Sequence, residues 1–145
     1  MPRGFTFIEL LIVSGLIIII STLTLPATIH FYKTQQLNDA KEGLVQVLRR
    51  AQQKAMSVEN DSSFGVYVGS GATGYYSLFR GISYQKKDDE EIFEVQKNII
   101  FGGDISEVVF TKLKGTPTVS GNITLTLDKE SGVININPIG RINRQ

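Results

Sequence analysis

The chain begins with a long stretch of apolar residues. Between residues 5 and 25 the only charged residue is Glu9. An α-helix crosses a bilayer with about 20 apolar residues, so this stretch predicts a transmembrane helix over residues 5–26. A carboxylate inside such a helix costs roughly 2.5–3.5 kcal/mol on insertion scales. A plain membrane anchor has no need for it, and Glu9 is therefore predicted to have a function.

The next stretch has one apolar stripe instead of an apolar surface all round. Apolar residues recur at spacings of three and four, which predicts an amphipathic helix over residues 27–58. The stripe consists of Leu37, Ala40, Leu44, Val47, Leu48, Ala51 and Ala55. Pro26 lacks an amide hydrogen and is expected to kink the helix between the two stretches. Together they predict one long helix, ending near Met56, whose second half is the spine of a further domain.

After a turn-forming segment at residues 59–63 the pattern changes to short β runs, so residues 59–145 are expected to form a β-rich domain. The expected strands are residues 64–68, 75–79, 91–95, 99–101, 107–111, 122–127 and 132–137. The predicted fold class is α+β, with a long N-terminal helix packed on antiparallel β-sheet.

Two pairs of these runs are expected to form hairpins. The first pair flanks a glycine-rich loop at residues 69–74, which lacks the Gly-Lys-Ser/Thr ending and the following helix of a phosphate-binding loop. The last pair alternates apolar and polar residues and is joined by residues 128–131. We expect Ile123, Leu125 and Leu127 to face one way, together with either Val133 or its neighbours Ile134 and Ile136, depending on the register.

The charged stretch at residues 86–91 has two interpretations. Its clustered carboxylates could hold a metal ion or a partner, but no EF-hand pattern accompanies them. A solvated loop is the interpretation that we adopt.

Composition argues against catalysis. The chain has 15 basic and 14 acidic residues, a net charge of +1 and no cysteine. Disulfides, thiol catalysis and cysteine metal sites are excluded, and bulk charge does not point to nucleic acid. The only histidine, His30, stands beside aromatic residues at the predicted membrane boundary, which is typical of an interfacial residue. No nucleophile elbow, zinc motif or cofactor fingerprint is present. We expect no enzyme, no cofactor and no metal.

The N-terminal residues Gly4-Phe5-Thr6-Phe7-Ile8-Glu9-Leu10-Leu11-Ile12-Val13 resemble the signature of type IV pilins and pseudopilins. The resemblance implies that residues 1–4 are a leader, that a prepilin peptidase cuts after Gly4, and that the new amine of Phe5 is methylated. Glu9 would then meet the Phe5 amine of a neighbouring copy during assembly. A secretory signal peptide fits less well because the apolar stretch is too long, and a simple single-pass anchor leaves Glu9 unexplained.

The second half resembles the GspH/FimT group of minor pilins. The resemblance rests on Val109-Phe110, on Gly121-Asn122-Ile123-Thr124-Leu125, on Ile134-Asn135-Ile136 and on the closing Gly140-Arg141-Ile142. It implies the pilin fold, in which an N-terminal helix with a membrane-spanning first half packs on antiparallel sheets.

These features predict a minor type IV pilin-like or type II secretion pseudopilin subunit, assembled into a pilus or pseudopilus for protein secretion. Its partners would be the prepilin peptidase, other pilin or pseudopilin subunits, the inner-membrane assembly platform and the membrane. Arg3 in the leader favours a single-pass protein of the cytoplasmic membrane with its C-terminal domain outside the cytoplasm. A pilus for adhesion or motility, and a solitary anchored domain, remain alternatives.

DNA binding during uptake (competence) is the other alternative. Some FimT-type pilins bind DNA through a C-terminal Gly-Arg-x-Arg motif, which would correspond here to Arg141 and Arg144. The second arginine comes one residue late, which in an extended strand places it on the opposite face. No aromatic platform accompanies the two arginines in the sequence. We therefore favour a structural subunit over a DNA-binding one.

Overall fold

The computed structural model describes residues 4–69 and 74–144, and for residues 23–28 it describes the backbone alone. Its internal contacts divide the chain into two units with a boundary between Thr34 and Gln35. Each unit is described by itself.

The first described element is α1 (Phe7–Met56), which runs from the first unit into the second. It begins two residues later than predicted and ends at Met56, so residues 57 and 58 of the predicted amphipathic stretch lie beyond it. The helix is continuous through residues 23–28. The side chain of Pro26 lies outside the described residues, so the kink predicted there stays a prediction.

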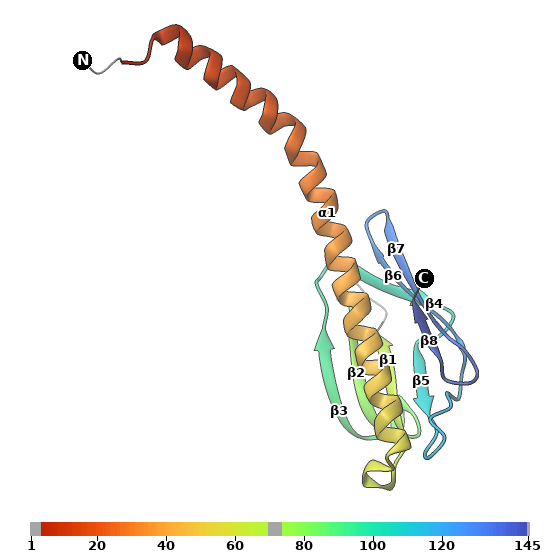
Figure 1. Ribbon diagram of the computed structural model, residues 1–145. Coiled ribbons are helices and arrows are strands. Elements are labelled where there is room, and N and C mark those ends of the chain that lie inside the picture. Colours follow the sequence, from red (N-terminus) through yellow and green to blue (C-terminus); the bar gives the residue numbers. More distant parts are fainter. Residues whose placement is uncertain (1–3, 70–73, 145) are drawn as a thin grey trace. The chain divides into compact units, whose positions relative to one another are not determined.

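In the second unit, α1 is followed by the short 3₁₀ helix η1 (Glu59–Asp61) and by strands that form two four-stranded antiparallel sheets. Sheet A has the order β3-β2-β1-β5, and sheet B has the order β4-β6-β7-β8. The strands are β1 (Phe64–Gly69), β2 (Tyr75–Gly81), β3 (Lys87–Glu94), β4 (Ile99–Gly103), β5 (Glu107–Phe110), β6 (Gly121–Leu127), β7 (Glu130–Ile136) and β8 (Ile142–Arg144). A second 3₁₀ helix, η2 (Tyr84–Lys86), lies between β2 and β3. The predicted α+β class, with the helix packed on antiparallel sheets, is confirmed (Figure 1).

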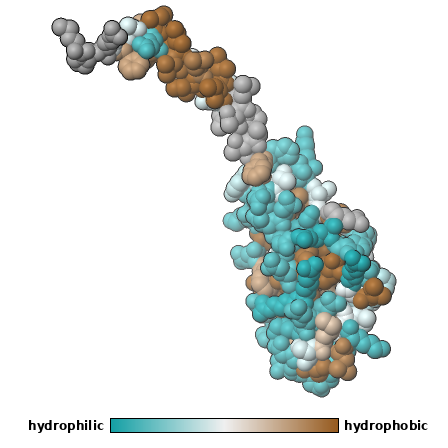
Figure 2. Space-filling model, viewed as in Figure 1, coloured by the Kyte–Doolittle hydropathy of each residue, from teal (hydrophilic) through white to brown (hydrophobic). Residues whose placement is uncertain are grey.

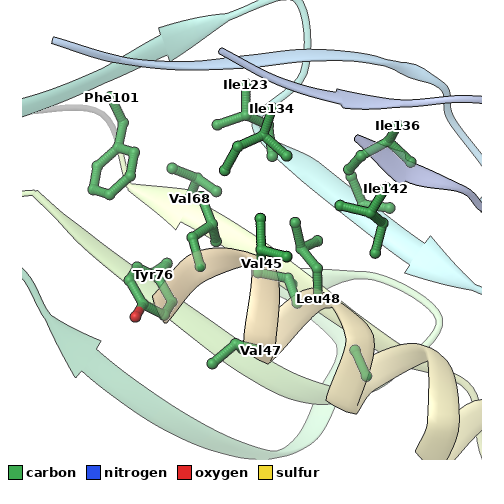
Figure 3. Close-up of a cluster of buried hydrophobic side chains, with 14 of the residues drawn as sticks. Val45, Val47, Leu48, Val68, Tyr76, Phe101, Ile123, Ile134, Ile136 and Ile142 are labelled. Carbon is green, nitrogen blue, oxygen red and sulfur yellow. The ribbon is translucent and has the colours of Figure 1, made fainter. Parts of the chain in front are cut away.

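The core of the second unit is built on the predicted apolar stripe. Leu44, Leu48, Ala51 and Ala55 are fully buried, whereas Ala40 is half-buried against the same cluster. Val45, which the stripe did not include, is also fully buried. In Figure 3, Val45 and Leu48 project from the helix toward the isoleucines of sheet B, which explains why the buried face is wider than one stripe. Those isoleucines are Ile123, Ile134, Ile136 and Ile142.

The hairpin of β6 and β7 is confirmed, with a register that pairs Ile123 with Ile134 and Leu127 with Glu130. Its inward residues are Ile123, Leu125, Leu127, Ile134 and Ile136. The register settles the alternative left open by the sequence, since Val133 is only half-buried. The turn is shorter than predicted, because residues 130 and 131 already belong to β7.

The hairpin of β1 and β2 is also confirmed as an antiparallel pair. Residues 70–73 of its glycine-rich loop lie outside the described residues. The predicted loop at residues 86–91 is wrong, because most of it belongs to β3, which pairs with β2 along one side only. An edge strand keeps its charges in water while its backbone is paired, and charged residues are a common feature of such strands. Charge alone therefore did not distinguish an edge strand from a loop.

The chain end contains a strand beyond those predicted, because β8 pairs with β7 as far as Arg144. Ile142 inserts its side chain into the core, and the last residue, Gln145, lies outside the described residues.

Candidate functional site

The predicted processing site is accessible and lies before the helix. Gly4 and Phe5 precede α1 and have no regular secondary structure. The side chain of Phe5 is 79% exposed. A Cβ atom added to Gly4 would meet nothing within 4 Å. The peptide bond after Gly4 is thus in an open, non-helical segment, as a protease substrate needs to be. Residues 1–3 of the predicted leader lie outside the described residues.

Thr6 and Glu9 define where the helix begins. The backbone N–H of Glu9 donates to Thr6 Oγ1 at 3.4 Å, and the N–H of Leu10 donates to the Thr6 carbonyl at 3.2 Å. Thr6 therefore occupies the N-cap position, with Glu9 three residues later as in the Thr-x-x-Glu capping box. Glu9 was predicted to act in assembly, and this local role was missed, although the Thr-x-x-Glu spacing is visible in the sequence.

Glu9 is exposed, and among the described residues no side chain pairs with its carboxylate. It stands at the start of an apolar helical surface. The large apolar side chains around it are exposed: Phe7, Ile8, Leu10, Leu11, Ile12, Val13, Leu16, Ile17, Ile18, Ile19 and Ile20. In the first unit, Figure 2 shows the visible face of this part of the helix almost entirely in the hydrophobic colour. An exposed apolar surface this continuous indicates contact with another apolar phase or another chain.

The hydroxyl groups within this part of the helix are satisfied locally. Ser14 Oγ donates to the Leu11 carbonyl at 3.0 Å, and Ser21 Oγ donates to the Ile17 carbonyl at 2.8 Å. Thr22 Oγ1 donates to the Ile19 carbonyl at 2.8 Å. Such back-bonding removes the need for water at these hydroxyls. Among the described side chains up to residue 22, Glu9 is thus the one strongly polar group without a hydrogen-bond or ion-pair partner in the chain.

Within the described residues no helix is both long and apolar enough to span a membrane. The side chains of residues 23–26, the end of the predicted transmembrane segment, are outside that description. A membrane-spanning first half of α1 therefore stays a prediction.

The two arginines proposed for DNA binding lie at either end of β8 and have different surroundings. Arg144 forms an ion pair with Glu42 of α1. Arg141 is exposed, and its backbone N–H donates to Asn137 Oδ1 at 2.7 Å. The Arg144 guanidinium is thus already held by a carboxylate and would have to leave it to contact a phosphate.

The lysines nearest to these arginines in the fold have different surroundings. Gly115 and Gly140 accept hydrogen bonds from the same Gln52 Nε2 atom, so the backbone next to Lys114 lies beside the backbone next to Arg141. Lys112 is paired with Asp61, as Arg144 is with Glu42. Lys129 lies in the turn between β6 and β7. Two of these basic groups are thus already held by carboxylates.

Metal-binding groups do not gather in the described residues. His30 is exposed, and its Nδ1 atom lies 3.5 Å from Thr34 Oγ1 on the same helix. No group of three or more His, Asp or Glu side chains in the described part of the chain has the arrangement of a metal site.

The candidate site is therefore the N-terminal segment with Gly4, Phe5 and Glu9, rather than a pocket of the second unit. Comparisons with protein-family models, with curated proteins and with solved structures found nothing that matches this chain.

Proposed function

We propose that this chain is a minor type IV pilin-like subunit or a type II secretion pseudopilin. A prepilin peptidase cuts it after Gly4, and the mature subunit joins a pilus or pseudopilus that serves protein secretion. Before assembly it resides in the cytoplasmic membrane through the first half of α1, with the second unit outside the cytoplasm. Its partners are the peptidase, other subunits and the inner-membrane assembly platform.

One observation carries this proposal: an exposed apolar helical surface contains a single unpaired carboxylate, one turn after an open Gly-Phe bond. Cleavage at Gly4 would create an amine on Phe5, outside the helix and close to the cap at Thr6. A neighbouring copy would then supply a positive charge for Glu9. An unpaired carboxylate is costly in an apolar phase, and pairing offsets much of that cost.

The processing step is tested with two matched glycine substitutions. Neither Gly4 nor Gly15 has an atom within 4 Å of an added Cβ, so Gly4→Ala and Gly15→Ala are both sterically harmless. In cells with a prepilin peptidase, we expect Gly15→Ala to mature to a chain that starts at methylated Phe5. Gly4→Ala should remain uncut if the peptidase needs glycine before the scissile bond. Mass analysis of the membrane-extracted N-terminus distinguishes these results, and an intact Met1 in the wild type would overturn the proposal.

The assembly step is tested with Glu9→Ala. We expect a processed subunit with a folded second unit that does not enter filaments, because a neighbour's amine would be left without its partner. Ser14→Ala is the control, since it removes a polar group that is bonded only to its own helix. Normal incorporation of Glu9→Ala would contradict the pairing.

A further inference from the structure

The outer face of sheet A, opposite α1, carries a group of aromatic residues. Along β1 the core residues alternate with Gly65, Tyr67 and Gly69, which face outward. Gly69 is opposite Tyr75 of β2, and a Cβ at Gly69 would lie 2.4 Å from the Tyr75 ring. The Tyr75 ring therefore lies directly against the backbone of β1, which only a glycine permits.

The segment η2 folds over this face and fixes the aromatic group. The Tyr84 ring stacks on Tyr67 with centroids 3.8 Å apart and an interplanar angle of 9°. Its backbone N–H donates to Glu107 Oε1 at 2.8 Å, and Lys87 Nζ lies 3.7 Å from the Tyr84 ring centroid. A side-chain hydrogen bond with Tyr84, followed by burial, raises the pKa of Tyr75. The Tyr75 ring is bounded by the backbone of Gly69 and by the Tyr67 ring, whose centroid lies 6.2 Å away.

Beside Tyr75 there is an open hollow of about 370 Å³. It is lined by Gly74, Tyr75, Ile92, Glu94, Val95 and Lys97. The hydrogen bond from the Val95 N–H to the Gly74 carbonyl, 3.1 Å long, closes one side of it. Ile92 is 56% exposed although it belongs to a strand. Among the described residues, neither the Glu94 carboxylate nor the Lys97 ammonium has a hydrogen-bond or ion-pair partner.

This combination is suited to a sugar that carries an acetamido group. The flat C–H face of a pyranose packs on an aromatic ring, and a carboxylate beside an ammonium can accept from and donate to neighbouring hydroxyls. The exposed side chain of Ile92 offers a place for an acetyl methyl group, while Glu94 can accept from the amide N–H. The volume lies within the usual range of small-molecule sites and fits one or two sugar units.

A peptide added as a further strand to β3 fits less well. The exposed edge of that strand carries Lys87, Asp88, Asp89, Glu90 and Glu91 in succession, which opposes strand addition. We propose that the hollow beside Tyr75 binds an N-acetylated amino sugar within a polysaccharide. This binding activity is independent of processing and assembly at the N-terminus, so either proposal can fail while the other stands.

The probe is the β-1,4-linked trimer of N-acetylglucosamine, titrated into the full chain in a detergent without a sugar headgroup. Calorimetry measures the affinity, and saturation-transfer NMR identifies the sugar protons that contact the protein. We expect millimolar to high-micromolar binding, with strong transfer to the acetyl methyl protons. Cellotriose and the deacetylated glucosamine trimer should each bind at least five-fold more weakly, since they lack the acetamido group. Equal affinity for all three sugars, or no binding of the acetylated trimer, would overturn the proposal.

Variants locate the site. Tyr75→Ala should weaken binding at least ten-fold, whereas Tyr75→Phe keeps the ring and should stay within three-fold of the wild type. Glu94→Gln and Ile92→Ser should each weaken binding several-fold and are placed at the surface, so they test the site even if Tyr75→Ala fails to fold. The matched control is Ile100→Ser. Ile100 lies on β4, and its exposed fraction of 55% is nearly the same as the 56% of Ile92. Binding that survives both Glu94→Gln and Ile92→Ser, or that Ile100→Ser weakens equally, would overturn the assignment.

Discussion

The two halves of α1 have the same secondary structure, but the apolar side chains of the first half are exposed and those of the second half are buried. Before residue 23 the helix is apolar nearly all round, and its large side chains are exposed. After Gln35 only one face is apolar, and that face is buried against the two sheets. Tertiary packing stabilises the second half, whereas nothing within the described chain covers the first half. The comparison indicates that the first half depends on an environment outside the chain, and the second half does not.

The largest expected difference comes from truncating one leucine in each half. Leu44 is 0% exposed and Leu16 is 55% exposed. Leu44→Ala should lower the free energy of unfolding by about 2–5 kcal/mol, because it leaves a cavity in the core. Leu16→Ala should change it by no more than about 0.5 kcal/mol. Denaturant unfolding of the full chain in detergent measures both, and similar losses would contradict the division of the helix.

A smaller effect is expected from Gln52, which ties the second half of α1 to two loops. Its Nε2 atom donates to the Gly115 carbonyl at 2.9 Å and to the Gly140 carbonyl at 3.0 Å. Gln52→Leu should destabilise the second unit by about 1–3 kcal/mol, because two partly buried acceptors lose their donor. Gln53→Leu is the control, since Gln53 is exposed on the same helix. An unfolding midpoint shared by the two variants would show that the contact contributes nothing.

A pH-dependent effect is expected from Tyr76, which packs in the core near α1. Burial raises its pKa above the ordinary value of 10.0. Below pH 10 both the folded and the unfolded state keep the proton, so the group contributes no pH dependence. Above pH 10 the unfolded state loses its proton first, and stability should fall by at most about 1.4 kcal/mol per pH unit. The fall between pH 9.5 and pH 11 should be shallower in Tyr76→Phe than in the wild type. An identical fall of stability with pH in the two proteins would contradict the assignment of this effect to Tyr76.

The smallest effect is expected from Arg144. Its ion pair with Glu42 is solvent-exposed, with side-chain exposures of 47% and 46%. Exposed pairs typically contribute between 0 and about 1 kcal/mol, so Arg144→Ala should barely change the unfolding midpoint. Arg141→Ala is the control, because the Arg141 side chain is also exposed.

The same two variants sharpen the question of DNA. At near-physiological salt we expect no binding of duplex DNA by the wild type. Binding that weakens as salt rises, and that is lost when both arginines are replaced, would favour the DNA-uptake alternative over the structural subunit.

Periodicity made most of the fold predictable. The spacing from Leu37 to Ala55 identified the buried helix face, and the alternation around Ile123 and Ile134 identified the hairpin with its inward residues. The sequence could not show that residues 87–91 pair as an edge strand, because pairing on one side is compatible with charge on the other. Nor could it show β8, since three residues carry no usable period and their pairing depends on the distant β7.

The candidate site was predictable where its residues are neighbours in the sequence. Gly4, Phe5 and Glu9 are contiguous, so their relation follows from the chain itself. The hollow beside Tyr75 brings together residues of β2, β3 and the following turn, and its shape depends on the register of Tyr75 against Glu94. Local patterns do not determine such registers, and no motif marked these residues in advance.

The edges of the two sheets have a consequence for polymerisation. β3 exposes a row of charges, β5 has four residues and ends beside a bridge to Pro117, and β8 has three residues, whereas the fourth edge strand, β4, has five residues and no charge. Short, charged or proline-flanked edges are poor templates for another strand. Three of the four sheet edges are thus protected against growth into a cross-β fibre, and β4 is the edge left open to another strand. If the subunit assembles as proposed, contacts between helices would leave both sheets intact.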